Sequence, residues 1–267
     1  MAAGTAVSIR EYGFSLYLVT KSLMELNPVV VGEFVGTAVL ILLGNGVVAG
    51  VLLNRSKAQD AGWLAISAGW ALAVFSGVAV STSIGDADAH LNPAFTVASV
   101  LMTGHSERLV TYIPAQILGA MTGAALVWLF YLPHWKHTSD PDKKLACFST
   151  GPAIRSYASN FMSECIATFV LVLVASSLVS RRLAPGGIAP GLGPVLVGAL
   201  VWSIGLSLGG TTGYAINPAR DLGPRLSHFL LPISGKGSSD WTYSWIPIFG
   251  PVCGAIAAAL FIRWTGI

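Results

Sequence analysis

Six long apolar stretches constrain the fold of this chain more than any other feature of its sequence. Each could cross a bilayer, because about 20 helical residues span a hydrocarbon core of about 30 Å. Of its 267 residues 54% are hydrophobic and only 10% are charged, whereas a soluble domain carries roughly 25% charged residues. The sequence therefore predicts an all-α membrane protein. The stretches are Val29–Leu53, Trp63–Ser83, Leu109–Leu132, Phe161–Val179, Leu192–Leu208 and Trp245–Trp264.

The charged residues between these stretches favour one orientation in the membrane. Adjacent Arg181 and Arg182 lie in a short connection, which is typical of a cytoplasmic loop. That placement puts both termini in the cytoplasm, with residues 1–27 as a cytoplasmic or interfacial segment. This segment ends without a small-residue cleavage site, so we expect no signal peptide.

Several other classes of function lack support in the sequence. The net charge of +3 is small and scattered, so no nucleic-acid partner is expected. An odd number of cysteines, with two inside apolar stretches, indicates no disulfide framework. The chain contains no nucleophile elbow, phosphate loop or paired-cysteine metal motif, so we do not expect an enzyme. The cysteines are Cys147, Cys165 and Cys253.

The chain repeats one plan of short segments twice. Each half has three long apolar stretches, so the second half must enter the membrane from the opposite side, as inverted repeats do. We therefore expect one membrane domain over residues 28–267, with repeat one at about 28–132, a connecting loop at about 133–157 and repeat two at about 158–267. The matching segments are Gly32–Thr37 with Ser163–Thr168, His90–Ala94 with Ala215–Ala219, and Gln116–Ala120 with Pro251–Ala255.

Each half also contains an Asn-Pro-Ala box that predicts the start of a short helix. Asparagine caps free amide groups, and proline at the first helical position has no N–H group to leave unpaired. The helix after Asn92 ends near Gly104, about eleven residues or roughly 17 Å, which is half a bilayer. The helix after Asn217 is similar and opposite in direction. The boxes consist of Asn92, Pro93 and Ala94, and of Asn217, Pro218 and Ala219.

Two capped helix ends inside the membrane favour a pore over a closed helical bundle. Non-helical backbone is tolerated at that depth where it is buried in protein or lines a watery cavity. If Asn92 and Asn217 cap their own helices with their oxygens, their amide N–H groups stay free to donate to a hydroxyl or to water. Both helix dipoles direct positive ends to the same point, which repels cations and protons.

Four ionisable residues within the membrane need an explanation. Arg220 is a candidate functional residue, and an ion pair with the adjacent Asp221 is the structural alternative. Buried carboxylates must be hydrogen-bonded, so we expect Glu33 and Glu164 to accept backbone N–H groups of the re-entrant loops. A proton relay through these residues is the alternative, although the sequence provides few further acids or histidines for it.

Two polar loops carry weaker signals. Asp86, Asp88 and His90 alternate as metal ligands could, but solvated residues do the same, so we expect no metal and a vestibule lined by the aspartates. His134, Trp135 and His137 lie in the long connection without a helical pattern, and we expect a surface loop.

The doubled Asn-Pro-Ala box in inverted repeats resembles the aquaporin superfamily, from about Val29 to Arg263. The resemblance implies six transmembrane helices plus two re-entrant half-helices, four protomers per assembly and one pore per protomer. The second box is similar to the glycerol facilitator, or aquaglyceroporin, branch, in which an Asp follows the Arg and a basic residue follows four positions later, as Asp221 and Arg225 do. Three further positions agree with that branch, namely Tyr131, Pro247 and Ile248.

The same resemblance implies which residues select the solute. The selectivity filter would consist of Trp70, Gly205, Tyr214 and Arg220, where Trp70 is matched by allowing a two-residue insertion in the loop 84–89. An interfacial anchor is the alternative role of Trp70. The residues expected to support the loops are Glu33, Glu164, His90 and Asp221.

The resemblance leads to one expected function. We expect a passive channel for glycerol and other small neutral polyols, with some water, that excludes ions and protons and needs no cofactor. It would be a homotetramer in the lipid bilayer of the plasma (inner) membrane. The alternatives are a proton-coupled secondary transporter, which shares inverted repeats, a structural or junction-forming protein, and within the family a channel for water, urea, lactic acid or metalloid acids.

Overall fold

The computed structural model describes residues 27–85 and 88–267. The segment expected over residues 1–27 therefore lies outside the described residues except for Asn27, and so does Asp86.

Every described element is a helix, which confirms the predicted fold class. Five helices are long and apolar enough to cross a membrane: α2 (Pro28–Leu52), α3 (Gly62–Gly85), α5 (Glu107–Phe130), α7 (Tyr157–Leu178) and α10 (Ile246–Thr265). A sixth, α8 (Leu192–Leu208), is apolar but shorter. The half-helices are α4 (Pro93–Thr103) and α9 (Pro218–Leu230), and the connecting loop holds a 3-10 turn (Trp135–His137) and α6 (Pro141–Ala146). All the predicted spans lie on these helices, so the chain is a multi-pass integral membrane protein.

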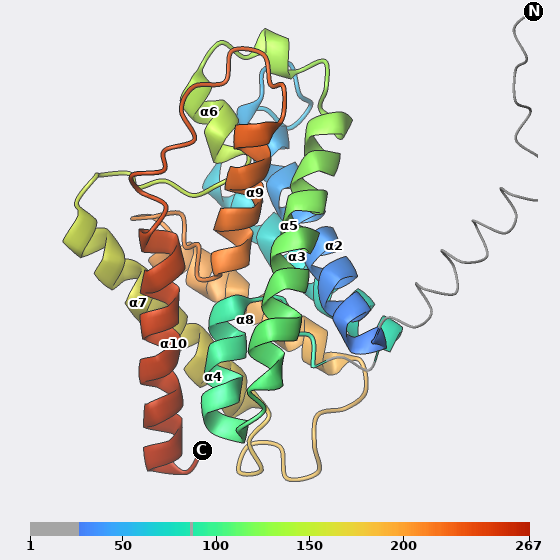
Figure 1. Ribbon diagram of the computed structural model, residues 1–267, viewed down its shortest axis with the longest axis vertical. Helices are drawn as coiled ribbons and strands as arrows, with labels where there is room; N and C mark the ends of the chain where they lie inside the picture. Colours follow the sequence, from blue (N-terminus) through green and yellow to red (C-terminus); the bar gives the residue numbers. More distant parts are fainter. Residues whose placement is uncertain (1–26, 86–87) are drawn as a thin grey trace, which may run out of the picture.

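The helices form one bundle in which the two half-helices enter from opposite ends. In Figure 1, α9 descends from the end that holds α6, whereas α4 lies at the end that holds the C-terminus. Helix α2 packs against α3 and α5, and α10 packs against α7. Each half-helix also packs against a long helix of the other half, α4 against α10 and α9 against α5. The two halves therefore interlock.

Three helices begin with the same Asn-Pro pair. Asn27 caps α2, and its Oδ1 accepts a hydrogen bond of 3.0 Å from the N–H of Val29. Asn92 and Asn217 cap α4 and α9 in the same way. The local chemistry of the pair thus sets these boundaries, because the side chain pairs an orphan amide and the proline has none to pair.

Glycines allow the long helices to approach each other closely. A Cβ atom at Gly119 of α5 would lie 2.3 Å from the carbonyl oxygen of Phe34 in α2, and one at Gly254 of α10 would lie 2.2 Å from that of Cys165 in α7. Both distances are shorter than any real contact of a Cβ atom, so larger residues would force these helices apart. Small residues at helix interfaces are typical of membrane bundles.

The expectation of a surface loop around Trp135 is wrong. Only 2% of Trp135 is exposed, and its Nε1 donates a hydrogen bond of 2.9 Å to the carbonyl oxygen of Trp128. Its ring lies 5.6 Å from that of Phe148, which is fully buried. The apolar residues of the connection thus fold back into the bundle, although His137 on the same turn is exposed. Periodicity missed this because the turn is too short to show one.

Candidate functional site

The two Asn-Pro-Ala boxes place equivalent caps at the starts of α4 and α9. Oδ1 of Asn92 accepts a hydrogen bond of 2.9 Å from the N–H of Ala94. Oδ1 of Asn217 accepts from the N–H groups of Ala219 and Arg220, at 3.0 and 3.2 Å. Both side-chain oxygens are thus used on their own helices, and both amide nitrogens are turned away from them.

The expectation that both amide groups stay entirely free is wrong. Nδ2 of Asn92 donates a hydrogen bond of 2.8 Å to the carbonyl oxygen of Ile216, and Nδ2 of Asn217 donates one of 2.7 Å to that of Leu91. Each amide therefore joins its own half-helix to the opposite loop. An asparagine amide has two N–H donors, so one N–H on each side chain is not used in these bonds.

Two buried glutamates hold the loops that precede the boxes. Glu33 of α2 accepts hydrogen bonds from the N–H groups of His90 and Leu91, at 2.6 and 2.8 Å. Glu164 of α7 accepts from those of Ala215 and Ile216, at 3.0 and 2.8 Å. This is the hydrogen-bond pattern expected from the sequence. Each carboxylate also accepts a hydrogen bond from a side chain to which the sequence analysis gave no role. Gln116 donates to Glu33, and Thr212 donates to Glu164.

The carboxylates hold backbone that would otherwise be unfavourable. In the loops that precede the boxes, four non-glycine residues have positive φ angles: Ala89 (50°) and Leu91 (49°) before the first, and Tyr214 (38°) and Ile216 (46°) before the second. Non-glycine residues in such regions cost on the order of 1–3 kcal/mol each and persist where their surroundings fix them. The two glutamates supply that restraint at equivalent positions of both repeats.

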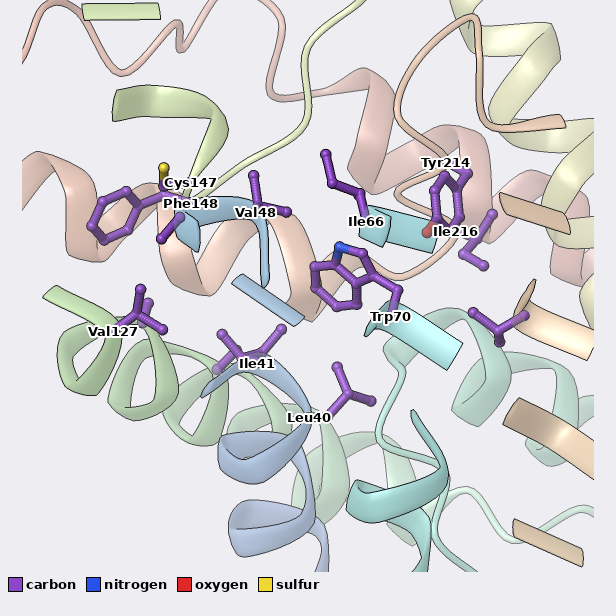
Figure 2. Close-up of a cluster of buried hydrophobic side chains, with 14 of the residues drawn as sticks. Leu40, Ile41, Val48, Ile66, Trp70, Val127, Cys147, Phe148, Tyr214 and Ile216 are labelled. Carbon is purple, nitrogen blue, oxygen red and sulfur yellow. The ribbon is translucent and has the colours of Figure 1, made fainter. Parts of the chain in front are cut away.

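Trp70 and Arg220, two of the residues expected to form the filter, lie against each other. The guanidinium carbon of Arg220 is 4.0 Å from the centroid of the Trp70 ring. Trp70 is 4% exposed and Arg220 is 7% exposed, so Trp70 is no interfacial anchor. Figure 2 shows the Trp70 side chain among buried apolar residues, between Leu40 and Tyr214. The arrangement combines a fixed cation with an aromatic surface.

The other two residues expected to form the filter, Gly205 and Tyr214, also lie close together. A Cβ atom at Gly205 would lie 2.9 Å from both Cζ and Oη of Tyr214. Trp63, which the sequence did not single out, lies on the same side: its Nε1 donates a hydrogen bond of 2.9 Å to the carbonyl oxygen of Gly205, and its ring lies edge-on to Tyr214 at 5.8 Å. The Tyr214 ring therefore occupies the space that the missing side chain leaves.

Asp221 pairs with Arg225 rather than with Arg220. Its Oδ1 accepts a hydrogen bond of 2.8 Å from Nε of Arg225, and both side chains are fully buried. Its Oδ2 accepts from the backbone N–H and the hydroxyl of Thr150, at 2.7 and 2.6 Å. Arg225 also donates to the carbonyl oxygen of Thr150 at 2.9 Å. The pair therefore fixes the connecting loop onto α9, and the adjacent Arg220 has no ion pair with Asp221.

At the other end of the site, His90 and Asp88 have partners of their own. Nδ1 of His90 lies 3.1 Å from the hydroxyl of Thr96, and Asp88 forms an ion pair of 2.5 Å with Arg108. Over residues 27–85 and 88–267, no group of three potential metal ligands lies together. Asp88 borders the cavity at this end, whereas Asp86 lies outside the described residues.

A cavity of about 330 Å³ connects these parts. Its walls include Asn92, Asn217, Trp70, Tyr214 and Arg220, which come from both repeats. Most of the remaining wall is apolar, with a few polar groups that converge on the lumen, as is typical of small-molecule sites.

Comparison with known proteins places the chain in one family. The profile of the family described as major intrinsic protein matches residues 21–262. The probable glycerol uptake facilitator protein of Thermotoga maritima is 52% identical over 88% of this chain and 98% of its own length. The glycerol uptake facilitator protein 3 of Lactiplantibacillus plantarum is 53% identical over 86% and 94%.

The fold agrees with a solved structure as well. The X-ray structure of the aquaglyceroporin from Plasmodium falciparum superposes with a TM-score of 0.77 at 30% identity, covering 88% of this chain and 94% of that one. The family match and the structural similarity both extend over most of the membrane domain. The chain therefore belongs to the major intrinsic protein family.

Proposed function

We propose that this protein is a passive channel for glycerol and other small neutral polyols, which also passes some water and excludes ions and protons. Two relatives about half identical to this chain are named as glycerol uptake facilitators. The observation that carries the proposal is the contact of Arg220 with Trp70 in a cavity that also exposes Asn92 and Asn217.

The chemistry of this cavity matches a polyol. Glycerol has hydroxyl groups along one edge and carbon atoms along the other, so it needs donors on one wall and apolar surface on the opposite one. Only Nη1 of Arg220 donates hydrogen bonds to the described residues, which leaves Nε and Nη2 for hydroxyl groups. The rings of Trp70 and Tyr214 offer apolar surface. Asn92 and Asn217 then present one N–H each to the next hydroxyl.

The same cavity disfavours cations. Both half-helices direct the positive ends of their dipoles to its centre, each equivalent to roughly half a charge. Arg220 adds a full charge, and no carboxylate lies within 4.0 Å of it among the described residues. A cation would therefore lose its hydration shell in a positive field, whereas a neutral polyol would not.

The buried ionisable groups support passive transport. Glu33 and Glu164 each accept three hydrogen bonds from the loops and their neighbours. Asp221 and Arg225 are bonded to each other and to the connecting loop. These groups hold structure, and a proton relay would need groups that are free to exchange protons with the lumen.

We also propose how the channel is placed in the cell: a homotetramer in the plasma (inner) membrane, with both termini and the loop around Arg182 in the cytoplasm. Lys136 is exposed in the turn Trp135–His137 that precedes α6. In Figure 1 this part of the chain lies at the end of the bundle that holds α6, whereas the connection between α7 and α8 lies at the end that holds the C-terminus. In intact cells, a membrane-impermeant maleimide should label a Lys136→Cys variant and leave Arg182→Cys unlabelled. Native Cys147 gives no background, because burial raises the pKa of its thiol. Native mass spectrometry would count the protomers.

Stopped-flow light scattering on proteoliposomes tests the choice of solute. Vesicles that contain the protein should pass glycerol much faster than protein-free vesicles, and water to a smaller extent. A longer polyol such as a hexitol should pass slowly, because it cannot align as many hydroxyl groups with the few donors. Fast water flux without glycerol flux would contradict the proposal.

A further inference from the structure

We infer that Asn45 is a positioning residue of the filter, which holds the Arg220 guanidinium and the connecting loop together from α2. The inference rests on the proposed function, because it assigns to Asn45 a part in selecting the solute. Nothing in the doubled boxes points to this residue, which stands alone as an amide in an apolar span.

Asn45 is fully buried in the middle of an apolar helix. Burying an unpaired amide is costly, so the side chain must be hydrogen-bonded. Its Nδ2 donates a hydrogen bond of 3.2 Å to the carbonyl oxygen of Phe148, and its Oδ1 accepts one of 3.5 Å from Nη1 of Arg220. Both ends of the amide are therefore used on groups of the filter region.

The contacts close a triangle around one end of the guanidinium. Nη1 of Arg220 donates to Oδ1 of Asn45 at 3.5 Å and to the carbonyl oxygen of Phe148 at 3.4 Å, and Asn45 bonds that same carbonyl. Asn45 thus fixes both acceptors of Nη1. Because these acceptors are neutral, they orient the guanidinium without cancelling its charge, and its other donors stay available to solute.

The neighbouring residue ties Trp70 to the same turn of α2. A Cβ atom at Gly44 would lie 2.3 Å from Cζ3 of the Trp70 ring, so the ring rests directly on the α2 backbone. One turn of α2 therefore sets the positions of both Trp70 and Arg220. A shift of that turn would change the 4.0 Å contact between them.

Two variants separate the orienting role of Asn45 from its contribution to folding. Asn45→Leu keeps the approximate volume and removes both hydrogen bonds. Asn45→Asp keeps the shape and an acceptor for Arg220, but it adds a negative charge beside the guanidinium. The matched control is Asn54→Leu, because Nδ2 of Asn54 also tethers the connecting loop, at the carbonyl oxygen of His137, and no contact joins it to Arg220.

The main readout is the ratio of glycerol to water permeability in the same proteoliposomes, which does not depend on how many channels have folded. Asn45→Leu should lower this ratio on the order of tenfold, the equivalent of losing one hydrogen bond to a charged group. Asn54→Leu should leave it unchanged. Asn45→Asp should stay close to the wild-type ratio and admit a measurable sodium leak, because the Arg220 charge is now compensated.

An unchanged ratio in Asn45→Leu would overturn the inference. If that variant does not assemble, Asn45→Asp decides alone, and a folded, sodium-tight Asn45→Asp channel would overturn it. The position of Arg220 gives a test that is independent of glycerol. A cryo-EM structure of Asn45→Leu should show the guanidinium displaced from its place over Trp70. A wild type without glycerol flux would contradict only the proposed function, and an undisplaced Arg220 only this inference.

Discussion

The guanidinium of Arg220 lies 4.0 Å from the ring of Trp70, although the two residues belong to opposite repeats. A cation over a tryptophan face is stabilised by about 2 kcal/mol or more when it is desolvated, and both side chains are buried. The contact therefore holds a charge in the membrane without a carboxylate partner. It also fixes the spacing between a donor and an apolar surface, which is what a polyol would meet.

Replacing Trp70 tests this contact. Trp70→Leu removes the aromatic face and leaves apolar volume, so Arg220 loses a stabilising interaction of about 2 kcal/mol and its fixed position. We expect glycerol permeability to fall more than water permeability in stopped-flow measurements. Trp264→Leu is the control, because that side chain is 81% exposed. Equal loss of both fluxes in the assembled Trp70 variant would mean that Trp70 does not select.

Gly205→His should reduce glycerol permeability far more than water permeability. The new Cβ atom would lie 2.9 Å from Tyr214, which lines the cavity, so the ring must shift, and the imidazole adds a donor that favours water. Both rates can be measured by shrinkage and re-swelling of the same vesicles. Gly210→His is the matched control, because Gly210 has open space around it. Proportional loss of both rates would remove Gly205 from the filter.

Asn217→Asp should weaken cation exclusion. The carboxylate puts a negative acceptor where both helix dipoles oppose cations. It also cannot donate to the carbonyl oxygen of Leu91, now bonded at 2.7 Å, so the link between the loops is lost. We expect sodium flux in vesicles that contain correctly assembled protein. Asn54→Asp, which changes an amide outside the lumen, should stay sodium-tight. An Asn217→Asp channel as tight as the wild type would contradict the electrostatic account.

Asp221→Asn should destabilise the protein strongly. Removing one partner of a buried ion pair typically costs about 3–5 kcal/mol, because the other charge is left unpaired, and Arg225 is fully buried. The thermal unfolding midpoint in detergent should drop by several degrees. Arg155→Gln, which breaks the more exposed pair with Asp240, should change stability by about 1 kcal/mol or less. Similar midpoints for the two variants would show that the buried pair is not a main support of the loop.

Features that depend on local chemistry could be predicted from the sequence. The Asn-Pro pairs cap their helices with their own side chains, so the starts of α4 and α9 follow from adjacent residues. Glu33 and Glu164 must be hydrogen-bonded wherever they are buried, and the nearby re-entrant loops supply the N–H groups.

Features that depend on contacts between distant segments could not be predicted in this way. Asn45 meets Phe148 and Arg220 across separations of 103 and 175 residues, and periodicity says nothing about such pairs. The bonds of the Asn92 and Asn217 amide groups could not be foreseen either, because their carbonyl acceptors in the opposite loop are 124 and 126 residues away in sequence. A lone amide in an apolar span, as at Asn45, is the signal that could have been used.

Glycerol equilibration under a proton gradient tests the central claim, a passive channel, most directly. Proteoliposomes would be loaded at one pH, diluted into labelled glycerol at another, and followed with and without an uncoupler. The account predicts that the internal concentration rises to the external one and stops there, at the same rate in both cases, because the buried acids hold loops and carry no protons. Accumulation above the external concentration that the uncoupler abolishes would contradict it.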